Sequence, residues 1–221
     1  MCDPMCGSGT FPVEAALIAA DTAPGLLRYS VKQSEAGVMR GFPNPLSWLD
    51  LQQEEVAAKW EEALRAARVR DRRTFMRSEC APAMVLANDV HSGSVALAQQ
   101  AATLAGVDHM VAFSCADVAD YRPARPPSLL VTNPPWNRRL LDAENSWRNL
   151  AVFLKTISTG LLKDANSGNK NAWVLSEQTE DDRKKNSSRT LHSQASMPSI
   201  RKRIGFRAAS VDLMFTQHQL A

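Results

Sequence analysis

The sequence lacks the patterns that mark membrane, disulfide-rich and zinc-binding proteins. Its four cysteines form no CxxC pair and have no histidine at zinc-ligand spacing, so we predict a reducing compartment and no metal site. No run approaches the roughly 18 apolar residues of a membrane-spanning helix, and no signal peptide opens the chain. The formal net charge is only +3, which excludes a chain that is basic along its whole length.

The composition is that of an ordinary globular protein, and its 221 residues suit a single domain over 1–221. Apolar runs alternate with helical patterns, which predicts an α/β fold with a mostly parallel, doubly wound sheet and helices on both faces. Strands are expected at residues 83–87, 111–114, 129–132 and 172–175. Helices are expected at residues 10–20, 51–70, 92–104 and 146–162.

The start of the chain departs from this pattern. In a doubly wound fold the glycine-rich turn follows a central strand, but only two residues precede Asp3. We therefore expect the first strand to be largely missing and the chain to be a fragment. Residues 24–82 are expected to form an insertion, and residues 178–203 a polar and basic loop.

The first motif is DPMCGSGTF at residues 3–11. Two glycines one residue apart let the backbone approach a ligand closely, and the start of the following helix favours polar or anionic groups. Pro12 stands in place of the third glycine of GxGxxG, which argues against NAD. Asp3, just before the turn, is typical of sites for cofactors that carry an amino group. A plain tight turn is the alternative.

The second motif is TNPPW at residues 132–136, directly after an expected buried strand. Two prolines fix a turn and leave backbone carbonyls without helical partners. The Asn133 Oδ1 and the Pro134 carbonyl can accept both hydrogens of an exocyclic amine, and Trp136 can stack on a flipped base. The alternative is a rigid turn with Trp136 in the core.

Together the two motifs resemble the class I S-adenosylmethionine (SAM)-dependent methyltransferases that act on exocyclic amines, and among them the THUMP-associated RNA guanine-N2 methyltransferases. The stretch AADTAPGL at residues 19–26, followed by a tryptophan-containing loop and a charged helix, is similar to the bacterial-type branch that modifies large-subunit ribosomal RNA. The resemblance covers most of residues 3–163. It implies a Rossmann-like fold, SAM as the cofactor, and an insertion like that at 24–82.

The resemblance also implies roles for individual residues. The cofactor would be held at its methionine end, its ribose and its adenine by Asp3, Gly7, Ser8, Gly9, Thr10, Asp89, Val90, Asp117 and Val118. The catalytic base pocket would consist of Asn133, Pro134, Pro135 and Trp136. Two of the acids have structural alternatives, because Asp89 could cap the next helix and Asp117 could stabilise a turn.

The chain departs from the family pattern after the tetrad NPPW. Asn137, Arg138 and Arg139 follow where the family usually has glycine and an acidic residue, and Trp136 replaces the commoner Tyr or Phe. These differences bear on substrate geometry more than on the type of reaction.

Positive charge is concentrated late in the chain, with eight basic and no acidic residues from 183 to 207. Such a surface can contact phosphates, although a solvated loop is an equal alternative. The candidate RNA contacts are Arg138, Arg139, Arg183, Lys184, Lys185, Arg201, Lys202 and Arg203.

The expected activity is transfer of a methyl group from SAM to the exocyclic N2 of guanine in RNA, with ribosomal RNA favoured over tRNA. Adenine-N6 or protein-glutamine methylation is one alternative, since these reactions use a similar receptor. A non-catalytic RNA-binding scaffold is another. We expect no membrane partner, a THUMP-type domain upstream, and a cytoplasmic location, or an organellar or nucleolar one if a targeting segment precedes the chain.

Overall fold

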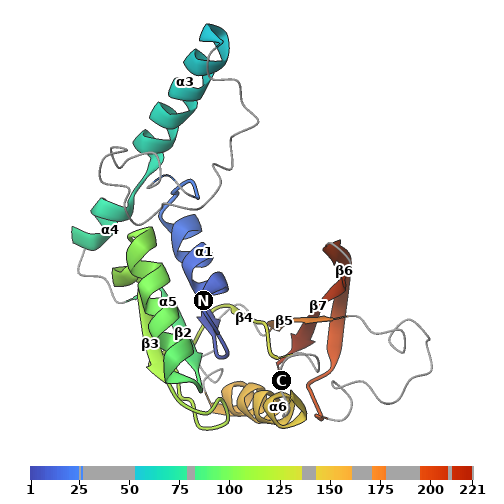
Figure 1. Ribbon diagram of the computed structural model, residues 1–221. Coiled ribbons are helices and arrows are strands. Elements are labelled where there is room, and N and C mark those ends of the chain that lie inside the picture. The colour runs from blue at the N-terminus through green and yellow to red at the C-terminus, as the bar shows by residue number, and fades with distance from the viewer. Residues whose placement is uncertain are drawn as a thin grey trace.

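The computed structural model describes residues 1–24, 26, 53–78, 83–135, 143–160, 171–177, 195–208 and 211–220. Its strands are β1 (Cys2–Asp3), β2 (Val85–Asp89), β3 (Val111–Cys115), β4 (Leu130–Thr132), β5 (Asn171–Glu177), β6 (Ile200–Ala208) and β7 (Val211–Gln219). Its helices are α1 (Thr10–Ala19), α3 (Glu54–Arg70), α4 (Arg73–Ser78), α5 (Ser92–Ala105), the short η2 (Asp108–Met110) and α6 (Ala143–Gly160) (Figure 1).

The strands form one seven-stranded sheet in the order β3-β2-β1-β4-β5-β7-β6. The pairs among β1 to β5 are parallel, whereas β7 is antiparallel to both β5 and β6. The predicted doubly wound α/β fold is confirmed. The first strand is only two residues long, yet it holds the central place in the sheet, where Cys2 pairs with both Leu86 and Leu130.

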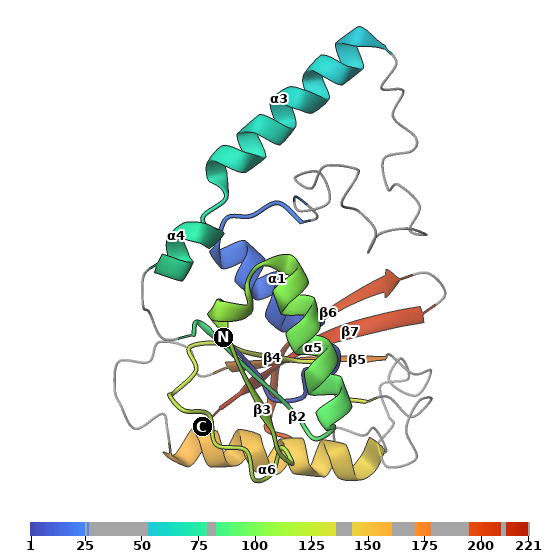
Figure 2. The same ribbon diagram turned by 60° about the vertical axis from the view of Figure 1, so that its left-hand side comes forward.

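Two apolar layers cover opposite faces of the sheet (Figures 1 and 2). On one face α1 and α5 lie side by side over β2 and β3, and their small residues Ala16, Ala98 and Ala102 are fully buried. On the other face α6 buries a helical stripe, which lies against Leu86, Leu130 and other residues of the sheet; the stripe consists of Trp147, Leu150, Phe153, Leu154 and Ile157. This stripe explains why the predicted helix forms.

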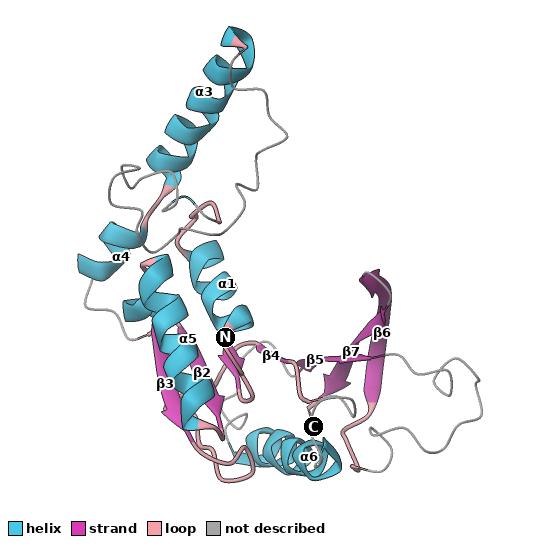
Figure 3. Cartoon of the chain, in the orientation of Figure 1, coloured by secondary structure: helices cyan, strands magenta, loops and turns pink. Residues whose placement is uncertain are grey.

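Helix α3 extends away from the body of the molecule (Figure 3). Its C-terminal end is hydrogen-bonded to the segment that follows α1. Arg70 Nε donates to Asp21 Oδ2 at 3.0 Å, and Thr22 Oγ1 donates to Asp71 Oδ1 at 2.8 Å. Arg73 then joins Asp71 to the end of α5, where its guanidinium donates to the Ala105 carbonyl at 2.7 Å. These contacts anchor the described part of the predicted insertion to the core.

The predicted loop over residues 178–203 is wrong from Ile200 onward, because Arg201, Lys202 and Arg203 belong to strand β6. The strand lies at the edge of the sheet and is exposed from Arg201 to Gly205, and its basic start, Arg201 to Arg203, has no apolar alternation to reveal a half-buried strand. The rest of that loop, residues 178–194, and the expected irregular segment 27–50 lie outside the described residues. Within the described parts, no helix has the length and apolar character needed to cross a membrane.

Candidate active site

The two sequence motifs meet at the carboxyl ends of β1 and β4, which are neighbours at the centre of the sheet. The strand order reverses there, because β1 is followed outward by β2 on one side and by β4 on the other. In open α/β sheets such a switch point is where ligands bind. Thr132 Oγ1 donates to Asp3 Oδ1 at 2.7 Å and so joins the two motifs directly.

The glycine-rich turn is fixed to the end of β2 by two hydrogen bonds that its backbone N–H groups donate. The Cys6 N–H donates to the Asn88 carbonyl at 2.8 Å, and the Gly7 N–H donates to Asp89 Oδ2 at 2.9 Å. Gly7 has a φ of +53°, and a Cβ added there would meet nothing within 4 Å. Ser8 and Thr10 are exposed beside it. The turn therefore presents open space, as a ligand site requires.

Gly9 has a packing role in addition to the ligand contact that the motif implies. A Cβ added at Gly9 would lie 2.8 Å from the Cβ and 3.0 Å from the Cα of Ala98 in α5. Its φ of +89° is also in the left-handed region. Glycine is needed here because α1 begins in close contact with α5.

We expect Gly9→Ala to lower the free energy of unfolding by about 2–5 kcal/mol, from left-handed strain plus overlap with Ala98. Gly7→Ala is the matched control, since it shares the positive φ but has no neighbour to overlap, and it should cost only about 1–2 kcal/mol. Urea unfolding of both variants measures the difference. Equal destabilisation would contradict the packing role of Gly9.

Asp3 lies beneath the turn with only 1% of its surface exposed. Its Oδ1 also accepts a hydrogen bond from the Met5 N–H at 3.2 Å. Burial raises the pKa of Asp3 to about 7, against the lowering effect of the bonds from Thr132 and Met5, and repulsion from Asp89 raises it further. Burial likewise raises the pKa of Cys6 to about 12, so this thiol stays neutral.

Asp89 stands at the end of β2, and both of its oxygens contact the backbone. Besides the bond from Gly7, Oδ1 accepts the His91 N–H at 3.0 Å. The alternative that Asp89 caps the helix is wrong, because the N-cap of α5 is His91 and no side chain forms a capping hydrogen bond there. Val90, the next residue, is 53% exposed. Asp89 itself is largely buried, with 9% of its surface exposed.

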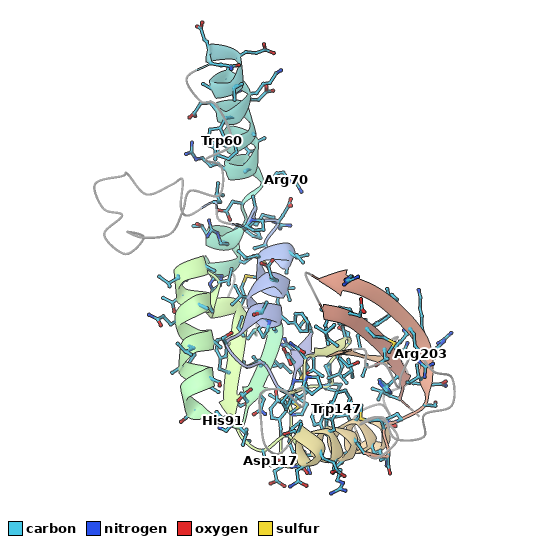
Figure 4. All side chains as sticks on the ribbon, turned by 45° about the vertical axis from the view of Figure 1, so that its right-hand side comes forward. Trp60, Arg70, His91, Asp117, Trp147 and Arg203 are labelled. Carbon is cyan, nitrogen blue, oxygen red and sulfur yellow. The ribbon has the colours of Figure 1, made fainter. Side chains whose placement is uncertain are left out.

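Asp117 follows β3 and is held by a residue that sequence reasoning missed. Its Oδ1 accepts the Ala119 N–H at 2.8 Å, as in the turn that was the structural alternative. Asn149 Nδ2 in α6 also donates to Asp117 Oδ1 at 3.0 Å and to Oδ2 at 3.1 Å. Val118 is 5% exposed and packs in the core under α6. Figure 4 shows Asp117 beside this helix.

The receptor motif directly follows β4, as predicted. Asn133 is exposed, and within the described part of the chain no hydrogen bond engages its side chain. Pro134 is buried, and the Pro135 carbonyl accepts a hydrogen bond from Trp147 Nε1 at 3.1 Å. The turn is therefore rigid while its amide is available. Trp136, Arg138 and Arg139 lie outside the described residues.

Asn88 is a second residue that sequence reasoning missed, and it is fully buried beneath the site. Its Nδ2 donates to the carbonyls of Pro4 and Ala116, each at 3.0 Å, and its Oδ1 accepts from Ser114 Oγ at 3.0 Å. It thereby ties the ends of β1, β2 and β3 together. A polar residue inside the otherwise apolar part of β2 was the available signal, because buried amides have hydrogen-bond partners.

The candidate RNA contacts that can be placed lie in β6, away from the turn. Arg201, Lys202 and Arg203 are exposed, and the bulge between Ile200 and Lys202 interrupts the regular alternation of side chains. Figure 4 shows Arg203 on this edge of the sheet. Arg183, Lys184 and Lys185 lie outside the described residues. Among the described residues no group of three metal-ligating side chains comes together.

The family model described as "RMKL-like, methyltransferase domain" matches residues 1–189. The chain belongs to this methyltransferase family. Curated relatives include the ribosomal RNA large subunit methyltransferase K/L of Shewanella baltica (strain OS155) and that of Shewanella oneidensis, each 36% identical over 138 residues. The match spans 62% of this chain but only 17% of each relative, so the chain corresponds to a small part of their length.

Solved structures of methyltransferases share the fold. A "possible methylase" from Clostridium difficile 630 aligns over 100% of this chain and 48% of its own, with a TM-score of 0.65 and 18% identity. SMU.472, described as "a putative methyltransferase complexed with SAH" (S-adenosylhomocysteine), gives a TM-score of 0.66 at 17% identity over 100% of this chain and 48% of its own. These likenesses agree with the class I methyltransferase topology of this RMKL-like domain.

Proposed function

We propose that this chain transfers a methyl group from SAM to the exocyclic N2 of a guanine in RNA, with ribosomal RNA as the favoured substrate. The observation that carries the proposal is the exposed Asn133 on a rigid turn at the end of β4, beside the glycine-rich turn of an RMKL-like methyltransferase domain. The names of the curated relatives support ribosomal RNA as the substrate class.

The residues around the switch point fit SAM. The open space at Gly7 suits the methionine end, the Asp89 carboxylate suits two ribose hydroxyls, and Asp117 suits the adenine amino group. Val90 is exposed where an apolar face of the cofactor can contact it. Asp3 would act from beneath by fixing the turn, since it is buried. SAM, when bound, supplies a methyl group activated by a sulfonium.

The protein's part in the transfer is orientation. The Asn133 Oδ1 and the Pro134 carbonyl would accept the two hydrogens of the amine, which directs the nitrogen lone pair toward the methyl group. The proton passes to solvent water after the nitrogen has gained its methyl, so no strong base is needed. The amine itself attacks the methyl group, so no protein nucleophile is needed. A neutral Cys6 thiol is therefore compatible with the proposed reaction.

The exposed basic residues of β6 are proposed to contact RNA phosphates, together with the candidate arginines and lysines outside the described residues. We expect the triple variant Arg201→Gln/Lys202→Gln/Arg203→Gln to weaken RNA binding. The slope of log Kd against log salt should fall by about 2 to 3, at about 0.7 to 0.9 for each of the three lost contacts. Lys59→Gln/Arg65→Gln on α3 is the control. An unchanged salt slope would show that these residues do not contact phosphates. Their charges would then serve to keep the exposed edge strand β6 from pairing with another chain.

The remaining partners are also part of the proposal. Ribosomal RNA in the names of bacterial relatives supports action in the cytoplasm, and the THUMP-type capture domain expected upstream would deliver the RNA. tRNA is the second RNA class to be tested.

Nucleoside mass spectrometry of RNA incubated with SAM and the protein tests the reaction. It should be run on the 221-residue chain and on that chain with any residues that precede Met1 in the natural protein. N2-methylguanosine is the expected product. N6-methyladenosine would replace the proposal with the adenine alternative. If no nucleoside is methylated, SAH binding separates a protein-glutamine enzyme, which binds it, from a scaffold, which does not.

A further inference from the structure

One helix contacts both halves of the candidate site. Near the start of α6, Trp147 Nε1 donates to the Pro135 carbonyl at 3.1 Å, and two residues later Asn149 Nδ2 donates to both oxygens of Asp117 at 3.0 and 3.1 Å. The first contact reaches the receptor turn after β4, and the second reaches the carboxylate after β3. Figure 4 labels Trp147 on this helix and Asp117 beside it.

Helix α6 cannot shift easily with respect to the sheet. Trp147 is 1% exposed, and Leu150, Phe153 and Leu154 are buried with it against the strands. Because protein interiors are close-packed, a helix held by such a stripe moves only if many contacts are lost. The two hydrogen bonds therefore fix two loop segments, the one at Pro135 and the one at Asp117, relative to the rigid helix α6.

The two contacts constrain different parts of the site. A hydrogen bond to the Pro135 carbonyl sets the orientation of the peptide group after Pro135, and so of the turn that carries Asn133 and Pro134. At Asp117, Ala119 and Asn149 together donate to both carboxylate oxygens, which fixes the plane of the carboxylate. The carboxylate retains lone pairs for a further donor.

We propose that α6 acts as a bracket in which Trp147 positions the amine receptor and Asn149 positions the carboxylate for the adenine amino group. Both are positioning residues, since each acts through another residue. The bracket sets the spacing between the base and the cofactor in the methyl transfer. This inference rests on the proposed function, because it assumes that Asp117 and Asn133 serve the cofactor and the substrate respectively.

The test compares three substitutions in one helix segment. Asn149→Ala should raise the Kd for SAH about tenfold, as expected for a disturbed hydrogen bond to a charged group, and change kcat at saturating SAM by less than about twofold. Trp147→Phe, which lacks the N–H, should lower kcat about tenfold and leave the Kd for SAH within about twofold. Arg148→Ala lies between them in an exposed pair with Glu144 and is the control.

The crossed pattern is the decisive readout, because general loosening of α6 would change both constants together. Isothermal titration with SAH gives the Kd, and unfolding midpoints identify loss of stability. If Trp147→Phe unfolds, Asn149→Ala still tests the bracket, since it removes no core side chain. Wild-type SAH affinity in the Asn149 variant overturns the bracket alone. Failure of the wild-type chain to bind SAH overturns the proposed function and the bracket with it.

Discussion

Asn133→Ala should reduce kcat by about 100-fold or more while the Kd for SAH stays within about twofold of wild type. The loss is large because the amide oxygen orients the reacting nitrogen, and removal of one such preorganised group commonly has an effect of this size. The affinity should persist because Asn133 is exposed beyond β4, whereas the cofactor residues follow β1, β2 and β3. Single-turnover methylation at saturating SAM and titration with SAH give the two values.

Two features of the structure make this variant easy to interpret. The turn is fixed by neighbours on both sides, through the Thr132–Asp3 and Trp147–Pro135 hydrogen bonds, so truncation at Asn133 should leave the unfolding midpoint unchanged. Asn133→Asp is the control, because it retains an oxygen acceptor and should be less impaired than the alanine variant. A parallel loss of kcat and SAH affinity would show that Asn133 belongs to the cofactor site instead.

The central strands could be predicted from the sequence because both of their faces are covered. β2 is buried at all five positions, and the predicted strand at 83–87 overlaps it. Such strands appear as continuous apolar runs, which need no knowledge of their partners. The helices α5 and α6 were predicted for a related reason, since their buried stripes repeat at helical spacing. Gly106 ends α5 in the left-handed conformation that glycine adopts easily.

The β6–β7 hairpin could not be predicted in the same way. β6 is exposed and basic, and β7 is placed between β5 and β6 by antiparallel pairing that no local pattern encodes. His218 illustrates the difficulty. It is fully buried in β7, with Nδ1 2.7 Å from the Pro198 carbonyl and Nε2 2.9 Å from Thr216 Oγ1. Thr216 lies two residues away on the same face of β7, but the contact with Pro198 exists only because the two segments pair.

The sequence predicted individual residues of the candidate site, but not the hydrogen bonds that hold those residues in place. Asp3, Gly7, Asp89 and Asn133 were found because they belong to motifs or end strands, and the sheet brings them to one edge. The residues that hold them in place have partners far along the chain: Asn88 lies 84 residues from Pro4, and Asn149 lies 32 residues from Asp117. Distances in sequence carry no information about such hydrogen bonds.

Asp89→Asn should raise the Kd for SAH by about 100-fold, because the carboxylate would lose charge-assisted hydrogen bonds from two ribose hydroxyls. A second effect accompanies it. Both Asp89 oxygens accept backbone N–H groups, from Gly7 at 2.9 Å and His91 at 3.0 Å, so the new amide would turn an NH₂ toward one of these donors. The variant should therefore also unfold at a lower temperature. Asp120→Asn makes the same chemical change at an exposed position and should alter neither quantity.

The two effects can be separated with an analogue of SAH that lacks both ribose hydroxyls. In the wild-type chain SAH should bind about 100-fold more tightly than the analogue, whereas in Asp89→Asn the two ligands should bind with nearly equal affinity. Disturbance of the Gly7 turn would weaken the binding of both ligands by the same factor, so it does not change the ratio of their Kd values. As in a double-mutant cycle, the ratio therefore reports only the contact between Asp89 and the ribose hydroxyls. If the ratio is unchanged in Asp89→Asn, the carboxylate fixes the glycine-rich turn and does not hold the ribose.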